Sequence, residues 1–481
     1  MTRVPAVVAV ALAALSGGWR SAPDPLDALL DDPILARALV GVRVDALDTG
    51  QTLYASNAAR HVVPASNMKI VTAAVAAEHL GWDFRYRTHL EAAGPVVDDV
   101  LEGDLVVTGS GDPSIGSTDE AASPVFSTWV DALRRAGIRR VHGRLVGDDD
   151  VFDDEGRGSG WSWDYLTAGY AAPSGGLSYN DNVAVVRARP GASPGAPATV
   201  LVTPPGHGLL VDNAVTTGAA GSRGTLSVSR RLGSRSLRAR GQVPMGDGEM
   251  VRTTAVENPT SFFVGSLASV LDAHGVTVRD GAWDIDELDR PLTTGVRRRV
   301  ATHESPPLSL LAGQLMKVSQ NFYAETLLKT IGLTVEGTGS EAAGRRAVRA
   351  TLASWGVPDD AVVVYDGSGL SRYNYVTADA LVAILTRIWK SETHRGPFVA
   401  TLPVGAHDGT LASRMRDTTL ARRVQAKTGS IANVRALSGY LETGSGRKLV
   451  FSIVVNHFTA PASEIDRIVE RFLSELSRSV H

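Results

Sequence analysis

The fold of this chain is decided by the stretch PASNMKIVTAA at residues 64–74, which places a serine and a lysine on one side of the first turn of a helix. Pro64 ends any preceding element, and the apolar run that follows from Ile70 predicts a helix buried on most of its faces. Side chains three residues apart on a helix lie one above the other. We therefore expect the amine of Lys69 to contact the hydroxyl of Ser66 and to accept its proton.

Two later stretches carry residues of matching chemistry, SQN at residues 319–321 and KTGS at residues 427–430. A serine followed three residues later by a lysine arises often by chance, so the first motif alone is a weak signal. In this order and spacing, the three motifs resemble the Ser-x-x-Lys, Ser-x-Asn and Lys-Thr-Gly set of the penicillin-recognising serine acyl-transferases. Together they are a strong signal of acyl transfer.

Composition limits the classes of partner. At 481 residues the chain is long enough for two or three domains with a large core. A formal net charge of -3 and a pI of about 6.4 give no basic field of the kind that binds nucleic acid or an anionic membrane. The absence of cysteine excludes disulfides, thiolate catalysis and cysteine-ligated metal centres. We expect neutral or mixed-charge partners, and no nucleic acid.

Lysine is rare in this sequence. Only six of the 48 basic residues are lysines, and two of the six, Lys69 and Lys427, lie in the motifs. A chain that favours arginine so strongly places lysine where an amine must lose its proton, which a guanidinium does not do in proteins. The alternative is coincidence.

The N-terminus has the pattern of a secretory signal peptide. Arg3 precedes an apolar run over residues 4–15, which is too short to cross a bilayer. We interpret residues 1–22 as the signal peptide; an uncleaved anchor is the alternative. No later stretch has the length of a membrane span, so we expect a secreted protein at the cell envelope, on the periplasmic side of a bacterial membrane, with no transmembrane span after cleavage.

The character of the sequence changes after the first motif and changes back before the second. Residues 23–84 and 295–481 are predicted to form one domain, which contains all three motifs. Residues 85–192 and 248–294 read as an inserted unit, and residues 193–247, rich in Gly, Ser, Thr and Val, as a small β domain within it. Within the first domain we expect a helix over Leu26–Leu39 and strands near both ends.

Three further stretches narrow the class: GSGDP at 109–113, GDD at 147–149 and DGSGLSR at 366–372. With the large insertion, they resemble the D-alanyl-D-alanine carboxypeptidase/endopeptidase family, the class C low-molecular-mass penicillin-binding proteins. The resemblance implies an α/β (α+β) fold like that of serine β-lactamases and transpeptidases, an antiparallel sheet flanked by helices and interrupted by two nested smaller β-rich domains. It also implies peptidoglycan stem peptides as substrates and β-lactam antibiotics as covalent inhibitors.

The resemblance assigns catalytic roles. Ser66 is the nucleophile, and Lys69 its general base, with a pKa lowered by burial and by Lys427. Ser319 relays the proton to the departing amine, and Asn321 holds the substrate's peptide amide. The backbone N–H groups of Ser66 and of residue 430 form the oxyanion hole.

The resemblance also assigns substrate-binding roles. Lys427 adds positive potential, while Thr428 and Ser430 bind the terminal carboxylate. The resemblance places Lys427, Thr428 and Gly429 on an edge strand, where Gly429 lets the substrate backbone approach.

A side-chain pocket for a diaminopimelate end needs a cation, an anion and an apolar wall. Arg372, beside Leu370, is the expected cation. Trp161, Asp164 and Tyr170 come from a loop that forms such a pocket in similar proteins, although the spacing between Asp164 and Tyr170 is one residue longer. The alternative is that Trp161 and Asp164 only cap a surface loop.

Competing signals are weak. The acidic run at residues 148–155 lacks the order of a calcium loop, the eleven histidines show no metal-ligand spacing, and no Gly-x-Ser-x-Gly is present. We expect neither a metal nor a cofactor. A β-lactamase is the rival enzyme, but no glutamate sits in a recognisable deacylation motif. A cell-wall binding protein with a silent site is the rival of another class, disfavoured because the nucleophile and base are intact.

Overall fold

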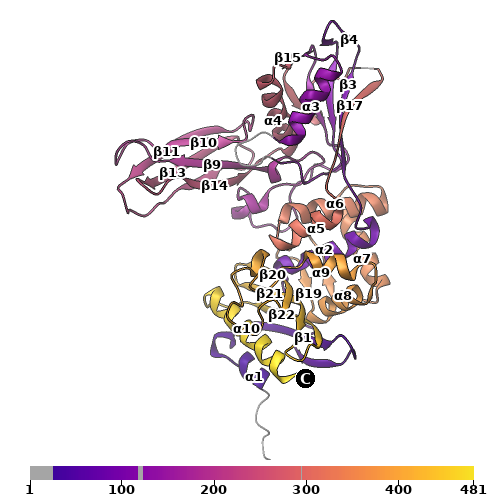
Figure 1. Cartoon of the computed structure of the whole chain (residues 1–481), viewed down its shortest axis with the longest axis vertical. Coiled ribbons are helices and arrows are strands. Elements are labelled where there is room, and N and C mark those ends of the chain that lie inside the picture. Colours follow the sequence, from indigo (N-terminus) through magenta and orange to yellow (C-terminus); the bar gives the residue numbers. More distant parts are fainter. Residues whose placement is uncertain (1–24, 117–122, 294, 481) are drawn as a thin grey trace, which may run out of the picture.

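The computed structural model describes residues 25–116, 123–293 and 295–480. Figure 1 shows one large domain that holds both ends of the described chain, a smaller α/β unit at the opposite end of the long axis, and an arm of strands that projects sideways. The expected signal peptide lies outside the described residues. No helix among the described residues is both long and apolar enough to cross a membrane.

The large domain is built on a five-stranded antiparallel sheet in the order β2-β1-β22-β21-β20. Its strands are β1 (Leu39–Ala46), β2 (Thr52–Ser56), β20 (Val424–Ile431), β21 (Val434–Glu442) and β22 (Lys448–Asn456). The pairing of β1 with β22 joins the two ends of the chain. The KTGS motif lies on β20 at the edge of the sheet, as predicted.

Helices cover both faces of this sheet. They are α1 (Pro25–Leu30), α2 (Met68–Leu80), α5 (Leu308–Lys317), α6 (Asn321–Glu336), α7 (Glu341–Ser354), α8 (Ala378–Lys390), α9 (Arg395–Thr401) and α10 (Ala462–Ser479). Alternate residues of a strand point to opposite faces. Val450 and Val454 accordingly pack with α2 and α8, while Phe451 and Ile453 pack with α10.

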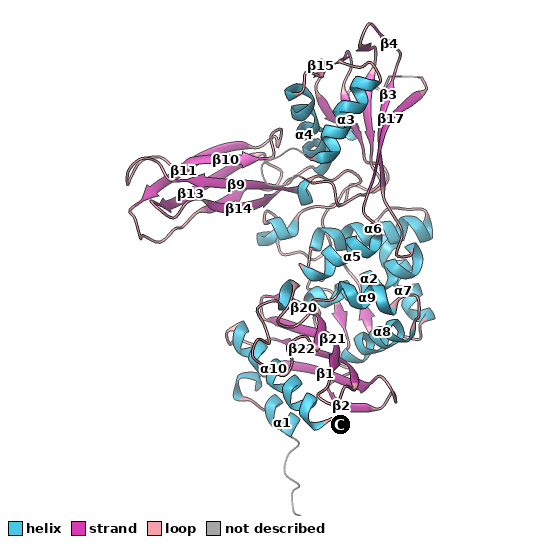
Figure 2. Ribbon diagram, in the orientation of Figure 1, coloured by secondary structure: helices cyan, strands magenta, loops and turns pink. Residues whose placement is uncertain are grey.

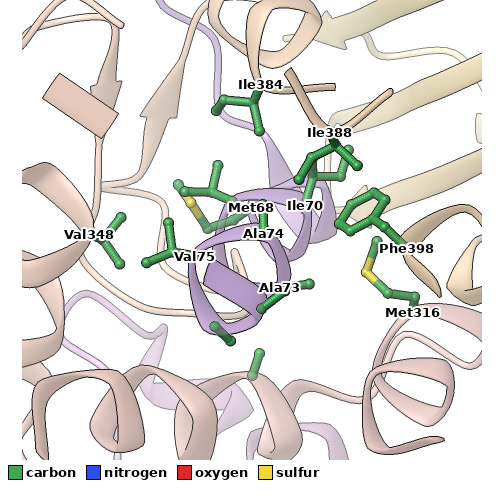
Figure 3. Packing of buried hydrophobic residues seen from close by; sticks show 14 of the residues in the cluster. Met68, Ile70, Ala73, Ala74, Val75, Met316, Val348, Ile384, Ile388 and Phe398 are labelled. Carbon is green, nitrogen blue, oxygen red and sulfur yellow. The ribbon is translucent and has the colours of Figure 1, made fainter. Parts of the chain in front are cut away.

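Helix α2 is the centre of the core. All residues from Met68 to Ala77 are buried, including Lys69. Figure 3 shows its side chains enclosed by residues of neighbouring helices, such as Met316, Val348 and Ile388. A helix buried on every side has no polar face, which agrees with the prediction from the apolar run.

The helix expected over Leu26–Leu39 is wrong in its extent. Helix α1 ends at Leu30, a 3₁₀ turn covers Pro33–Leu35, and β1 begins at Leu39. Pro33 cannot continue a helix, and its ring disfavours helical backbone at the residue before it. Asp32 instead caps the 3₁₀ turn, its carboxylate accepting the N–H of Ile34 at 3.0 Å.

The smaller unit has a five-stranded sheet in the order β16-β8-β6-β3-β17 and a four-stranded sheet in the order β15-β7-β5-β4. The strands are β3 (Arg87–Ala93), β4 (Val96–Val97), β5 (Val100–Leu101), β6 (Asp104–Thr108), β7 (Arg140–Val141), β8 (Leu145–Asp148), β15 (Thr277–Val278), β16 (Ala282–Asp284) and β17 (Arg297–Glu304). Helices α3 (Pro124–Arg135) and α4 (Pro259–Ala273) pack on it.

The arm consists of two three-stranded sheets and contains no helix in Figure 2. Its strands are β9 (Val183–Arg189), β10 (Thr199–Thr203), β11 (Leu210–Gly218), β12 (Ser227–Arg230), β13 (Ser236–Pro244) and β14 (Met250–Ala255). Strands β9 and β14 pair with each other outside the expected range 193–247, and β17 pairs with β3 beyond residue 295. We therefore propose boundaries near residues 183 and 255 for the arm and near 304 for the inserted unit.

Candidate active site

Ser66 sits on a 3₁₀ turn, Ala65–Asn67, that leads directly into α2. Its side chain is partly exposed, whereas its neighbours Ala65 and Asn67 are buried. Ala65 has a positive φ of 46°, and a Cβ on Gly369 would lie only 1.8 Å from the Ala65 carbonyl oxygen. Gly369 is therefore required for the loop at residues 366–374 to lie against the nucleophile turn.

The amine of Lys69 lies 2.9 Å from Ser66 Oγ, 2.6 Å from Asn321 Oδ1 and 2.9 Å from the Ser368 carbonyl oxygen. The two latter oxygens can only accept hydrogen bonds. A neutral amine gives its two N–H groups to them and keeps its lone pair for the proton of Ser66. The contacts of Lys69 therefore orient it as a base towards the serine hydroxyl.

Burial lowers the pKa of Lys69 to about 7, against the negative charges of Glu325 and Asp366, which raise it. A base with a pKa near the working pH combines a usable neutral fraction with proton affinity. Burial, and next the charge of Lys69, hold the pKa of Lys427 well below its ordinary value. Burial was expected to lower the pKa of Lys69 and is the largest cause, whereas Lys427, which was also expected to lower it, is not among the causes.

Lys427 reaches from β20 towards the second motif. Its Nζ donates to Ser319 Oγ at 2.8 Å and to the Thr428 carbonyl at 2.9 Å. Ser319 has a positive φ of 64°, an uncommon conformation for a residue with a side chain. Such strain tends to gather at active sites, where the surrounding structure enforces it.

Two buried acids missed as site residues hold the loop that faces Lys69. Glu325 accepts the N–H groups of Gly367 at 2.9 Å and Ser368 at 3.0 Å. Asp366 accepts those of Gly369 at 2.7 Å and Ser371 at 2.6 Å. Together they fix the Ser368 carbonyl against the amine. Glu325 lies four residues after Asn321, so an acid facing the same side of an apolar helix was the available signal.

A cleft of about 660 Å³ opens over these groups. All three motifs line it. The lining residues are Ser66, Tyr165, Tyr170, Ser319, Asn321, Gly369, Leu370, Thr410, Thr428, Ser430, Ile431, Ala432, Asn433, Arg435, Phe458, Ala460 and Ala462. Tyr165, Thr410 and Arg435 were not predicted, because nothing in the sequence places their loops and strand beside the motifs.

The structure separates the residues expected for the side-chain pocket. Leu370 and Tyr170 line the cleft. Trp161 is buried behind Leu370, and its Nε1 donates to Asp366 Oδ2 at 2.8 Å. Asp164 is exposed and does not line the cleft. Arg372 also lies outside the lining, and its Nη2 donates to the carbonyl oxygen of the cleft residue Ala432 at 3.1 Å.

Gly429 has a different neighbour from the one expected. A Cβ at this position would lie 2.6 Å from the Pro64 carbonyl oxygen and 2.9 Å from Ala436 Cβ. The glycine thus lets β20 approach the turn before the nucleophile; its expected role towards the substrate backbone stays a prediction.

One carboxylate cluster occurs elsewhere among the residues that the structure describes. Asp149, Asp150 and Asp286 bring carboxylate oxygens within 4.8 Å of one another in the inserted unit. None of the three lines the cleft, and two of them are exposed. The chemistry of the serine and lysine does not involve this cluster.

The sequence matches the family described as D-Ala-D-Ala carboxypeptidase 3 (S13) over residues 23–476. A D-alanyl-D-alanine carboxypeptidase of Actinomadura sp. (strain R39) is 35% identical over 451 residues, 91% of this chain and 81% of that protein. The D-alanyl-D-alanine carboxypeptidase DacB of Haemophilus influenzae is 26% identical over 429 residues, 87% of this chain and 86% of that protein. The crystal structure of penicillin binding protein 4 (dacB) from H. influenzae matches with a TM-score of 0.80 at 24% identity, covering 95% and 99% of the two chains.

The chain therefore belongs to the D-Ala-D-Ala carboxypeptidase 3 (S13) family. It is a serine-type D-Ala-D-Ala carboxypeptidase with the fold of a low-molecular-mass penicillin-binding protein. This confirms the family and the fold class expected from the resemblance carried by the motifs, the three further stretches and the large insertion.

Proposed function

We propose that this enzyme removes the terminal D-alanine from peptidoglycan stem peptides, and opens D-alanyl cross-links, through an acyl-enzyme on Ser66. One observation carries the assignment of the nucleophile: Lys69 Nζ lies 2.9 Å from Ser66 Oγ while its other two contacts are acceptors only. This is the geometry of a serine activated by an adjacent amine.

In the proposed first half-reaction, Ser66 Oγ attacks the carbonyl carbon of the penultimate D-alanine and its proton moves to Lys69. The backbone N–H groups of Ser66 and of residue 430 stabilise the oxyanion. Ser319 relays a proton: it gives one to the leaving amine and takes one from Lys427, whose Nζ donates to Ser319 Oγ at 2.8 Å, and D-alanine departs. The C–N bond breaks as the ester forms.

In the second half-reaction, a water molecule attacks the ester carbonyl and Ser66 leaves as its hydroxyl. Lys69, which took the serine proton during acylation, returns it to Ser66 Oγ. The proton of the water passes through Ser319 to Lys427, so that both amines regain their starting states.

Asn321 accepts from Lys69 through Oδ1, and its Nδ2 donates to the Tyr170 carbonyl at 2.8 Å. To hold the substrate's peptide amide as proposed, Asn321 Nδ2 releases the Tyr170 carbonyl and donates to the substrate instead.

β-Lactams are proposed to acylate Ser66 as stem-peptide analogues. The fold relative from H. influenzae has been solved in complex with a β-lactam. Export through the signal peptide would place the enzyme outside the cytoplasmic membrane, where peptidoglycan is found. We also propose that a diaminopimelyl end is recognised by Tyr170 and Leu370 in the cleft, with Asp164 and Arg372 just outside its lining and Trp161 packed behind Leu370.

Two assays test the proposed function and its rivals. Release of D-alanine from a peptide ending in D-Ala-D-Ala is expected, together with slow, near-stoichiometric consumption of benzylpenicillin. Fast penicillin turnover without D-alanine release would indicate a β-lactamase. If neither D-alanine release nor penicillin consumption occurs, the chain is a binding protein and the proposal fails.

A further inference from the structure

The arm carries a positive charge that the net charge of the whole chain conceals. Residues 183–255, from β9 to β14, contain nine arginines and three acidic residues, a formal net charge of +6, whereas the whole chain carries -3. The rest of the chain is therefore acidic, and the arm, which projects sideways in Figure 1, is a separate region of positive charge. The expectation that the protein has no basic field does not hold for the arm.

Five of the nine arginines lie in one stretch of eleven residues, RRLGSRSLRAR at 230–240, which contains no acidic residue. This stretch ends β12, forms a turn and continues as β13. Arg230 has a structural role, because its side chain is fully buried and donates to Glu257 at 2.6 Å. The four others are exposed: Arg231, Arg235, Arg238 and Arg240.

Strand β13 presents its arginines on the outside of the arm. Leu237 and Ala239 are buried inside the arm. Arg238 and Arg240 alternate with them, so they lie on the outer face about 7 Å apart along the strand. Arg238 pairs with Asp212 at 2.9 Å, which leaves Arg240 as the unpaired cation of this face.

Three of the exposed guanidiniums have no partner. The neighbours of Arg240 across the sheet are Ser227 on β12 and Ala214 on β11, and neither is acidic. Arg231 and Arg235 lie in the turn between β12 and β13. None of the three guanidiniums makes an ion pair or a hydrogen bond within the described part of the chain. They are therefore available to an anionic partner.

The composition of the arm favours a phosphodiester backbone as that partner. Residues 183–255 contain no Phe, Trp or Tyr. The arm therefore lacks both the stacking surface that binds nucleic-acid bases and the aromatic anchors of a membrane interface. It offers arginines beside exposed serine hydroxyls on the same face, namely Ser227, Ser229 and Ser236. Arginine and serine are typical contacts of phosphodiester oxygens, and the guanidinium fork fits a phosphate with two hydrogen bonds.

We propose that the outer face of β12 and β13, with the turn between them, binds a linear phosphodiester polymer of the cell envelope through Arg231, Arg235 and Arg240. A polymer fits better than a single ion, because the guanidiniums are spread along the strand and the turn. None of the three lines the catalytic cleft, so the arm would hold the enzyme near its substrate without taking part in the reaction. The inference goes beyond the proposed function and takes from it only the location in the cell envelope.

The test measures binding of fluorescently labelled poly(glycerol phosphate) to the intact enzyme by anisotropy. The wild type should bind, and its affinity should fall steeply as salt is added, because binding releases counterions. A variant that combines Arg231→Gln, Arg235→Gln and Arg240→Gln should raise Kd at least tenfold. A wild type that does not bind the polymer, or a variant that binds it as tightly, would overturn the inference.

The matched control combines Arg37→Gln, Arg60→Gln and Arg298→Gln. These arginines are exposed, lie outside the arm and make no ion pair within the described part of the chain. Their removal changes the net charge by the same amount, so Kd should stay within twofold of the wild type. Equal losses in the two triple variants would mean that only the net charge matters, and the inference would be wrong.

Two other probes test the chemistry of the partner. Polyglutamate of similar length and vesicles that contain anionic lipid should each bind at least tenfold more weakly than poly(glycerol phosphate). Binding of either probe as tight as that of the phosphodiester polymer would overturn the assignment.

Release of D-alanine from a soluble peptide should be the same in both triple variants as in the wild type, because none of the six arginines lines the cleft. This assay reports on folding and separates the outcome from that of the proposed function. If the triple arm variant does not fold, Arg240→Gln alone decides. It should raise Kd about threefold, and an unchanged Kd would contradict the inference.

Discussion

The indole of Trp161 donates from Nε1 to Asp366 Oδ2 at 2.8 Å, and this bond joins the inserted unit to the loop that faces the catalytic amine. Asp366 is fully buried and holds the backbone of that loop, whose Ser368 carbonyl accepts from Lys69 at 2.9 Å. The inserted unit thus helps to fix, through Asp366, the loop whose carbonyl orients the amine of Lys69.

Trp161→Phe tests this support. The variant loses the hydrogen bond to a buried carboxylate, worth about 1.5–3 kcal/mol, so we expect kcat/KM for D-alanine release to fall roughly tenfold. The matched control is Trp163→Phe, because Trp163 is 82% exposed and its replacement should leave the rate unchanged. An active Trp161→Phe enzyme with wild-type kinetics would show that the bond does not position the loop.

Acylation should depend on pH through Lys69. Burial lowers the pKa of this amine to about 7. Only the neutral amine accepts the serine proton. The acylation rate should therefore level off above pH 7 and fall about tenfold for each pH unit below it. Stopped-flow acylation by benzylpenicillin measures this profile.

Lys69→Arg supplies the contrast. It keeps a positive charge but has no amine that can lose a proton, so acylation should be lost at every pH. A variant that still acylates with the same acid limb would mean that another group is the base.

Gly429→Ala should damage the site through packing. The added Cβ would lie 2.6 Å from the Pro64 carbonyl oxygen, so β20 or the nucleophile turn must shift. We expect unfolding free energy to fall by about 1–3 kcal/mol and acylation to slow. Urea unfolding and penicillin labelling measure the two effects.

Gly313→Ala is the control for that variant, since it lies in helix α5 with open space around the added atom. Alanine there should stabilise the protein by about 0.5–1 kcal/mol. A Gly429→Ala protein as stable and reactive as wild type would show that the strand tolerates the side chain.

The diaminopimelate pocket is tested by Asp164→Ala and Arg372→Ala. Asp164 raises the pKa of the cleft residue Tyr170 through its charge, after the larger effect of burial and that of Tyr165. Arg372 bonds the backbone of the cleft residue Ala432. Each variant should lower kcat/KM roughly tenfold for peptides with a free diaminopimelyl end and leave a simple thioester unaffected. Equal losses on both substrates would assign the two residues to the catalytic centre instead.

The sequence predicted the elements whose pattern is local and strong. The apolar run after Ser66 predicted the buried helix α2, and the three motifs predicted that Lys69 would contact Ser66. The boundaries proposed here for the arm, near residues 183 and 255, are wider than the predicted 193–247, because β9 and β14 are joined to the arm by strand pairing, which the sequence does not reveal.

Arg435 was not predicted to line the cleft because it is placed there by pairing opposite Ser430 on the next strand. Glu325 was missed because its partners, the N–H groups of Gly367 and Ser368, lie on a loop that is distant in sequence.

The central claim, that Ser66 forms the acyl-enzyme, is tested most directly by intact mass after incubation with benzylpenicillin. The wild type should gain one penicillin, and proteolytic peptides should place it on Ser66. Ser66→Ala should fold, since losing a hydroxyl at a helix start costs at most about 2 kcal/mol, and should gain nothing. An adduct that persists in Ser66→Ala, or that maps to another residue in the wild type, would contradict the account.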